Sequence, residues 1–306
     1  MYQAKLQSKN CYHIFDPVHD RSQKGHHERI ERLQQALIDN EFTLYYQPKV
    51  NMHTGEMVGA EALIRWQHPE KGLLPPAAFL PDINNHALDI ELGRWVINSA
   101  LEQLVAWQRT GLNIEVSVNV SAQQLQDEFF LEQLDSLLAA HPAVNPSSLE
   151  LEILESSALQ DLQLVSQTMK ICSHNGVKFA LDDFGTGYSS LTYLKTLPAE
   201  VLKIDRSFVH GMLTNSEDMA IIKGVLGLAR AFHRGVVAEG VETTEQGTSL
   251  IKLGCVIAQG YGIARPMPAT EIQNWLKSWH PPEAWGDSFP DAELALSPFE
   301  DASSKS

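Results

Sequence analysis

Two kinds of apolar pattern alternate along most of the chain. Short, nearly continuous apolar runs are typical of buried strands, and longer segments with apolar residues at helical spacing separate most of them. The strand-like runs cover 42–50, 57–66, 115–121, 149–155, 177–184, 200–206, 235–242 and 255–261. The helical segments cover 92–109, 131–140, 162–174, 218–232 and 244–253. The alternation predicts an α/β fold, and eight strands in about 250 residues predict a (β/α)8 TIM-like barrel.

The connection between the first two predicted strands differs from the others. It consists of residues 51–56 alone, which is too short for a helical crossover, and it contains Thr54-Gly55. A β-hairpin with this pair in its turn fits the length. We therefore expect one barrel strand to run antiparallel to its neighbours.

The two ends of the chain fall outside the barrel pattern. Residues 1–16 have the character of a helix end and a short strand, too short to fold alone, and the polar residues 17–28 predict a linker. The barrel domain is expected over 29–280. Residues 281–306 thin into Asp, Glu, Ser and Ala, which predicts a disordered tail.

Charge and cysteine content narrow the partners and the compartment. With 23 Lys and Arg against 38 Asp and Glu, the net charge of −15 disfavours a nucleic acid polymer or an anionic membrane as partner. No apolar run approaches the roughly 20 residues of a membrane span. The three cysteines, Cys11, Cys172 and Cys255, lie far apart and match no C-x-x-C or zinc spacing. Reduced thiols are therefore expected, which favours the cytoplasm.

Polar side chains occupy positions inside the predicted strands. Barrel strands are buried on both faces, so such residues need a functional explanation. In 115–121 the three valines share one face and Asn119 lies on the other, and the same alternation separates Lys203 from Leu202 and Ile204. Seven of the eight predicted strands carry such a polar residue: Glu61, Asn119, Glu152, Asp182, Asp183, Lys203, Glu239 and Gln259. We expect these side chains to meet at the C-terminal ends of the strands, where barrel enzymes place their chemistry.

The carboxylates of this set, on Glu61, Glu152, Asp182, Asp183 and Glu239, predict bound cations. In one pocket they would repel one another and raise each other's pKa unless cations were present. Oxygen ligands without His or Cys favour Mg²⁺, Mn²⁺ or Ca²⁺. The adjacent Asp182-Asp183 pair fits two ions that share a carboxylate, about 3.5 to 4 Å apart, as in enzymes that direct water onto phosphorus. The pattern therefore predicts phosphodiester hydrolysis.

Lys203 has two interpretations in this pattern. Beside the ions it would orient or deprotonate the attacking water, with a pKa lowered by the metals. Alternatively, it forms a structural ion pair with Asp205. Residues 183–190 likewise fit either a glycine-rich turn or a mobile active-site loop, and their position directly after two carboxylates favours the loop.

The same motifs resemble those of the EAL domain family of cyclic di-GMP phosphodiesterases, over about residues 30–279. The matching motifs are Tyr46-Gln47-Pro48, Glu61-Ala62-Leu63-Ile64-Arg65-Trp66, Asn119-Val120-Ser121, Glu152-Ile153-Leu154-Glu155, Asp182-Asp183-Phe184-Gly185-Thr186-Gly187, Lys203-Ile204-Asp205, Glu239-Gly240-Val241-Glu242-Thr243 and Gln259-Gly260-Tyr261. Their number and order make the resemblance specific. It implies a barrel enzyme that opens cyclic di-GMP to linear pGpG with two Mg²⁺ or Mn²⁺ ions per site and is inhibited by Ca²⁺.

The resemblance also implies a role for each matching residue. One ion would be held by Glu61, Asn119, Glu152 and Asp182, and the other by Asp182, Asp183 and Glu239. Lys203 would position the water, so that Lys203, Glu61 and Glu239 form the catalytic set. Substrate contacts would come from Gln47, Leu63, Arg65 and Gln259. Glu155 would anchor the loop 183–190, near which family members commonly form homodimers. Glu242 would support the metal ligands without binding an ion itself.

The chain departs from the family pattern at Leu154, where the family usually has Thr. Packing or hydrogen bonding beneath the site and loop is therefore expected to differ, whereas the ligands are all present. Residues 1–16 resemble the end of a GGDEF-like domain, which implies that the chain is part of a longer protein. Such a parent protein is compatible with membrane attachment even though this chain is expected in the cytoplasm.

Other interpretations of the barrel remain open. Some EAL domains have lost catalysis and serve as cyclic di-GMP receptors or regulatory binding modules, commonly after loss of a metal ligand or of the loop sequence. An amidohydrolase-like barrel would need a His-x-His on a strand, which the sequence lacks. An enolase-like barrel would lack the Asp182-Asp183 pair and its glycine-rich loop.

Overall fold

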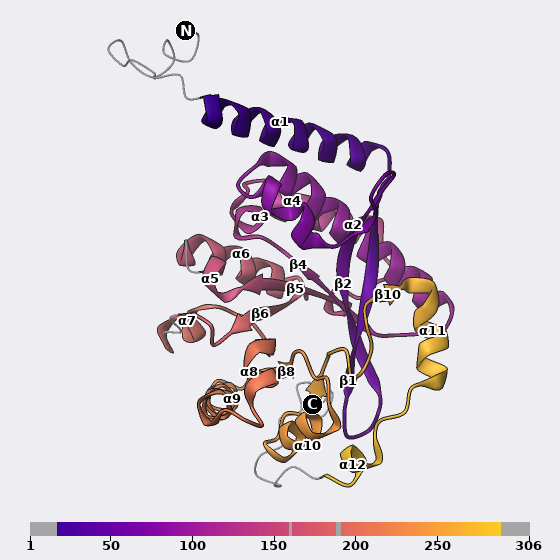
Figure 1. The fold of residues 1–306 in the computed structure, drawn as a ribbon, viewed down its shortest axis with the longest axis vertical. Helices are drawn as coiled ribbons and strands as arrows, with labels where there is room; N and C mark the ends of the chain where they lie inside the picture. Colours follow the sequence, from indigo (N-terminus) through magenta and orange to yellow (C-terminus); the bar gives the residue numbers. More distant parts are fainter. Residues whose placement is uncertain (1–16, 159–160, 188–190, 289–306) are drawn as a thin grey trace.

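The barrel is closed by eight strands in the computed structural model, which describes residues 17–158, 161–187 and 191–288 (Figure 1). In order around the barrel these strands are β1 (Phe42–Asn51), β2 (Met57–His68), β4 (Glu115–Asn119), β5 (Leu149–Leu154), β6 (Lys178–Phe184), β7 (Val201–Ile204), β8 (Gly235–Ala238) and β9 (Ile257–Ala258). β9 pairs with β1 and closes the ring. Two short strands pair with members of the ring: β3 (Gly72–Leu74) lies antiparallel to β2, and β10 (Met267–Pro268) lies antiparallel to β1. The predicted TIM-like barrel is confirmed.

β1 is the antiparallel strand of the barrel, as the short hairpin predicted. It runs antiparallel to both β2 and β9, whereas the remaining neighbours in the ring are parallel. Gly55 in the hairpin turn has a φ of 76°, a conformation that glycine adopts without strain. The register of the hairpin sets Gln47 directly opposite Glu61.

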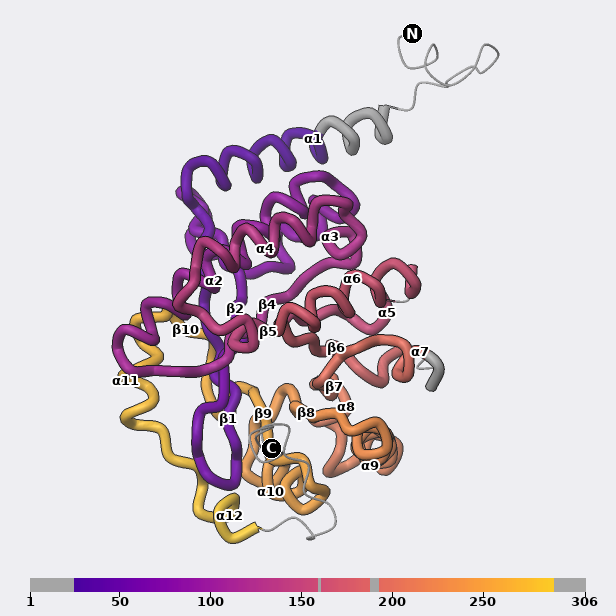
Figure 2. Tube along the Cα trace, turned by 180° about the vertical axis from the view of Figure 1, so that it is seen from behind, coloured from indigo at the N-terminus to yellow at the C-terminus, as the bar shows by residue number. Residues whose placement is uncertain are grey.

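Helices cover the outside of the barrel (Figures 1 and 2). The longer ones are α1 (Pro17–Ile38), α2 (Ala87–Arg109), α4 (Phe130–Ala140), α6 (Leu162–His174), α9 (Ser216–Ala231), α10 (Thr244–Lys252) and α11 (Ala269–Ser278). The shorter ones are α3 (Ala122–Gln126), α5 (Glu155–Ala158), α7 (Leu191–Thr196), α8 (Arg206–Gly211) and α12 (Glu283–Gly286), with single 3-10 turns at Pro76–Ala78, Leu80–Ile83 and Pro146–Ser148. Each helix that the sequence predicted is present, with ends that differ by a few residues. The short helices lack the length that a periodic pattern needs to be recognised.

The interior of the barrel is partly apolar and partly charged. Ala180, Val201, Val237 and Ile257, on β6 to β9, form a separate apolar cluster. Each lies two residues before a predicted site residue, on the same face of its strand. The buried charged side chains of the interior are Lys49 on β1, Glu150 and Glu152 on β5, and Lys203 on β7. The layer of side chains beneath the site is therefore only partly apolar.

The structure describes part of both ends of the domain. Residues 17–28, expected to be a linker, are helical and form the first part of α1, with Pro17 at its first position, where proline fits a helix. The disordered tail was expected from residue 281, but α12 is ordered there and Trp285 is only 2% exposed. The burial of this one indole explains why a polar, proline-rich segment forms an ordered helix. Residues 1–16 and 289–306, the predicted domain remnant and the rest of the tail, lie outside the described residues.

Within the part of the chain that the structure describes, no helix combines the length and apolar character needed to cross a bilayer.

Candidate active site

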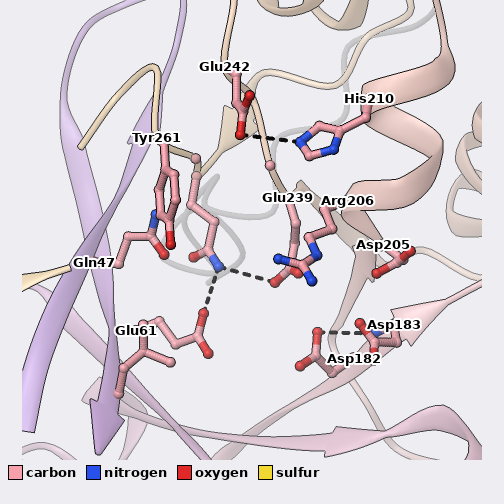
Figure 3. A pocket seen from close by; sticks show the side chains of 14 residues that line it. Gln47, Glu61, Asp182, Asp183, Asp205, Arg206, His210, Glu239, Glu242 and Tyr261 are labelled. Carbon is pink, nitrogen blue, oxygen red and sulfur yellow. Dashed lines mark hydrogen bonds and ion pairs between the residues drawn. The ribbon is translucent and has the colours of Figure 1, made fainter. Parts of the chain in front are cut away.

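An acidic pocket opens at the C-terminal ends of the barrel strands (Figure 3). Eight of the predicted site residues line it: Gln47, Glu61, Leu63, Asp182, Asp183, Glu239, Glu242 and Gln259. They come from five strands or from the residues that directly follow a strand. The alternation of side chains along each strand therefore brings together, in the folded chain, residues far apart in the sequence.

Lys203 on β7 is the charged centre beneath the pocket. Its ammonium Nζ lies 2.5 Å from Glu152 Oε2, 2.6 Å from Glu239 Oε1, 3.0 Å from Asp182 Oδ1 and 3.5 Å from Glu61 Oε2. These four carboxylates come from four other strands or strand ends. Lys203 and Glu152 are fully buried. The ion pairs of Lys203 with the site carboxylates favour its placement in the site over the alternative, a structural ion pair with Asp205.

Two amides hold the Glu61 carboxylate on β2. Asn119 Nδ2 donates to Glu61 Oε1 at 2.8 Å, and Gln259 Nε2 donates to Glu61 Oε2 at 2.6 Å. Gln259 Nε2 also donates to Glu239 Oε1 at 3.1 Å. Glu61, Asn119, Gln259 and Glu239 are thus tied into one network, as the sequence predicted when it assigned them to one site.

Asp182, Asp183 and Glu239 form a group that can hold a metal ion. Each offers a carboxylate oxygen, and these atoms lie within 4.8 Å of one another. Neighbouring residues of a regular strand point to opposite faces, but Asp183 has a φ of 51° and the β6–β7 register shifts between Leu181 and Phe184. This break brings both aspartates toward the pocket (Figure 3). Oxygen ligands of this kind suit Mg²⁺ or Mn²⁺, so the residues fit the predicted ions.

Crowding of the carboxylates changes their acidity. Burial and the charge of Asp182 raise the pKa of Asp183 to about 6. Burial, followed by the charges of Asp182 and Glu61 against the opposing effect of Lys203, raises the pKa of Glu239 to about 8. Burial and the charge of Glu152 also raise the pKa of Glu61. Divalent cations would relieve the repulsion that these shifts express.

The two residues beneath the pocket are charged at neutral pH. Burial acts to lower the pKa of Lys203, but Glu152, Glu239 and the other carboxylates outweigh it and hold this pKa well above its usual range. For Glu152 the opposite holds, because Lys203 and Lys49 outweigh burial and lower its pKa to about 2. The protein's own groups therefore do not lower the pKa of Lys203 as expected. The surrounding carboxylates stabilise its charged form and raise this pKa instead.

Some predicted residues lie at the edge of the pocket or outside its lining. Arg65 stacks over the ring of Tyr45, with 5.6 Å from its guanidinium carbon to the ring centre, and does not line the pocket. Asn119 lines a neighbouring, mostly apolar cavity together with Leu63 and Leu154. Leu154 is 42% exposed there. The effect of Leu in place of Thr on packing and hydrogen bonding near the site stays a prediction.

Glu155 and Glu242 occupy positions next to the ligands. Glu155, at the start of α5, is buried, and its Oε2 accepts a hydrogen bond from the backbone N–H of Gly185 at 3.1 Å. Glu242 Oε1 lies 3.5 Å from His210 Nε2 at the rim of the pocket (Figure 3). The contact of Glu155 fits an anchor of the loop, of which residues 188–190 lie outside the described residues.

The sequence interpretation missed several residues of the pocket. Asp205, Arg206, His210 and Tyr261 line it as well, and Asp205 shares a hydrogen bond with Asp183. Asp205 and Tyr261 belong to the matching motifs and could have been assigned from them. Arg206 and His210 lie on the short helix α8, so strand alternation carries no signal for them.

Comparisons with known proteins agree with this geometry. The model of the EAL domain family matches residues 30–266. The bifunctional diguanylate cyclase/cyclic di-GMP phosphodiesterase MucR of Pseudomonas aeruginosa is 40% identical over 273 residues, which are 89% of this chain and 40% of that protein. The cyclic di-GMP phosphodiesterase PdeR of Escherichia coli is 33% identical over 279 residues, 91% of this chain and 42% of that protein.

The chain thus spans about two fifths of the length of these curated relatives. Among solved structures, a MucR phosphodiesterase in complex with c-di-GMP superposes with a TM-score of 0.76 at 41% identity, and the match covers 80% of this chain and 99% of that one. The EAL enzyme Bd1971, in a form with cAMP and cyclic-di-GMP bound, gives a TM-score of 0.77 at 32% identity over 83% of this chain and 70% of that one. From its barrel, its acidic site and the match over 30–266, this chain belongs to the EAL domain family.

Proposed function

We propose that this chain hydrolyses cyclic di-GMP to linear pGpG with the help of two divalent metal ions. The observation that carries the proposal is the group of Asp182, Asp183 and Glu239 above the Lys203 ammonium, at the end of the barrel where enzymes of this fold act. Relatives named as cyclic di-GMP phosphodiesterases support the choice of substrate.

We assign the metal ligands as the family resemblance implied them. Glu61, Asn119, Glu152 and Asp182 would hold one ion, and Asp182, Asp183 and Glu239 the other. Bound Mg²⁺ or Mn²⁺ would supply an activated water and positive charge beside the scissile phosphate. The inward side chains named in the two ligand sets and Lys203 carry five carboxylates and one ammonium, a formal charge of −4 that two divalent ions would balance.

Lys203 would act as a hydrogen-bond donor that orients the attacking water. The carboxylates around it keep its ammonium protonated, which fits a donor better than a base. Gln47 and Gln259 would bind polar groups of the substrate, and Leu63 would contact its apolar faces. Arg65 would join them only after leaving Tyr45, a rearrangement within the reach of its flexible side chain.

The loop after Asp183 would cover the site during turnover. Glu155 would hold it through the backbone of Gly185, and Glu242 would support the ligands from the rim. A homodimer that forms near residues 183–190 would let the partner influence this loop. A cytoplasmic location completes the proposal, because cyclic di-GMP and Mg²⁺ would be available there.

The deciding experiment incubates the purified chain with cyclic di-GMP and Mg²⁺ or Mn²⁺ and follows pGpG by chromatography. A Glu61→Ala variant should lose the activity, and a Glu132→Ala variant, altered at an exposed residue of α4, should keep it. Binding of the nucleotide without any pGpG would favour the alternative, a catalytically silent receptor or regulatory module.

Replacement of Mg²⁺ by Ca²⁺ gives a second test. Ca²⁺ takes more ligands at longer and less regular distances, so we expect it to bind at the acidic group but misplace the water. Hydrolysis should stop when Ca²⁺ is added in excess over Mg²⁺ and return when it is removed. Equal turnover with either ion would contradict the two-ion arrangement.

A further inference from the structure

A buried ion pair beneath the site has no role in the proposed chemistry. Lys49 on β1 and Glu150 on β5 are both buried inside the barrel, with Lys49 Nζ 2.7 Å from Glu150 Oε1. β1 and β5 are not neighbours in the ring, so the lysine reaches across the interior. The same ammonium lies 3.1 Å from Glu152 Oε1.

Glu152 is therefore held from two sides. Lys49 binds its Oε1, and Lys203 binds its Oε2 at 2.5 Å. A carboxylate fixed through both oxygens cannot rotate about its last bond, and its two oxygens are distinguished by the lysines. The oxygen bound to Lys203, Oε2, shares this ammonium with the carboxylates of Glu61, Asp182 and Glu239.

Packing alone does not explain a charge pair at this depth. Buried ion pairs pay a large desolvation cost, and apolar residues of similar volume often serve a fold equally well. Part of the same interior is filled in that way by Ala180, Val201, Val237 and Ile257. The pair of Lys49 and Glu150 lies next to Glu152 instead, since Glu150 is two residues before Glu152 on the same face of β5.

We propose that Lys49 is a positioning residue of the metal site, which fixes Glu152 from below so that one defined oxygen faces the site. Glu150 keeps Lys49 in place and balances its charge. The proposal rests on the proposed function in one respect, that Glu152 takes part in binding a divalent cation. Removal of such a supporting contact lowers metal affinity without removing a ligand.

The test measures binding of Mn²⁺ alone to the metal-stripped chain by titration calorimetry. Lys49→Met and the double variant Lys49→Met/Glu150→Gln should bind Mn²⁺ about tenfold or more weakly. The double variant removes both charges of the pair, so it leaves no unpaired buried ion and provides the test if Lys49→Met alone does not fold. Glu150→Gln keeps the contact between Lys49 and Glu152 and should bind within about threefold of the unaltered chain.

Arg32→Met is the matched control. Arg32, on α1, forms an ion pair with Glu41 and does not line the pocket, so its loss should lower stability but leave Mn²⁺ affinity within about threefold. Unaltered affinity in the double variant would overturn the proposal, as would an equal loss in the double variant and in Arg32→Met. An unaltered chain that binds no Mn²⁺ would overturn it as well. If that chain binds Mn²⁺ but yields no pGpG, only the proposed function fails.

Discussion

Gln259 donates a hydrogen bond to Glu61 at 2.6 Å, although 198 residues separate them in the sequence. The same nitrogen reaches Glu239 at 3.1 Å, so one amide bridges carboxylates from both sides of the site. Closure of the barrel makes this possible, because β1 pairs with both β9 and β2 and so places the last and the second strand on either side of it.

The bridge and the proposed substrate contact together predict the effect of Gln259→Leu. Loss of the polar contact to substrate should raise KM for cyclic di-GMP about ten- to a hundredfold, and loss of the hydrogen bonds to Glu61 and Glu239 should also lower kcat. Steady-state kinetics with saturating Mg²⁺ measure both constants. A matched control is Gln133→Leu on α4, far from the strand ends. A fall in kcat at constant KM would instead assign Gln259 to the chemical step.

Metal binding should depend on pH. With pKa values of about 6 for Asp183 and about 8 for Glu239, the metal-free site holds protons at neutral pH that cations must displace. Apparent Mg²⁺ affinity should therefore rise from pH 6 to pH 8, with protons released on binding.

The same two carboxyl groups determine how the stability of the folded protein depends on pH. Because their folded pKa is raised above the unfolded value, metal-free protein gains stability from them at low pH and loses it as pH rises toward 8. Bound Mg²⁺ replaces those protons, so the increase in Tm caused by Mg²⁺ should be larger at pH 8 than at pH 6. Thermal unfolding with and without Mg²⁺ measures it, and an increase in Tm independent of pH would contradict the raised pKa values.

Leu154→Thr restores the residue usual in the family. Because Leu154 is 42% exposed and lines the apolar cavity beside the site, the free energy of unfolding should change by less than about 0.5 kcal/mol. Turnover should change less than about threefold, since no ligand moves. Denaturant unfolding and the pGpG assay test both values. A large loss of stability would show that the leucine supports the barrel.

Trp285→Ala tests the ordered segment after residue 280. The indole is buried against α10 and its Nε1 donates to the carbonyl of Thr244 at 2.9 Å. The substitution should cost about 3–5 kcal/mol of unfolding free energy and leave kcat unchanged at a temperature where the variant is folded. Trp275→Ala, on a half-buried indole, should cost less. Equal stability of the Trp285 variant and the unaltered chain would contradict the packing.

The sequence by itself determined the architecture and most of the site. Alternating strand and helix patterns specify the barrel, and the six residues 51–56 specify the antiparallel hairpin, because both signals are local. Strand alternation also fixes which side chains face inward, which is why Glu61, Glu152, Lys203 and Gln259 were assigned correctly to the interior.

Only the tertiary structure decided which of these side chains meet. Strand alternation does not say which residues of distant strands lie at the same height, since that depends on the stagger of the closed barrel. It therefore left the contact of Lys49 with Glu152 unseen. The turn of Asp183 into the pocket depends on a local break in the strand, and Arg206 reaches the rim from a helix. The order of residues 281–288 likewise depends on a single buried indole, Trp285, which a polar composition conceals.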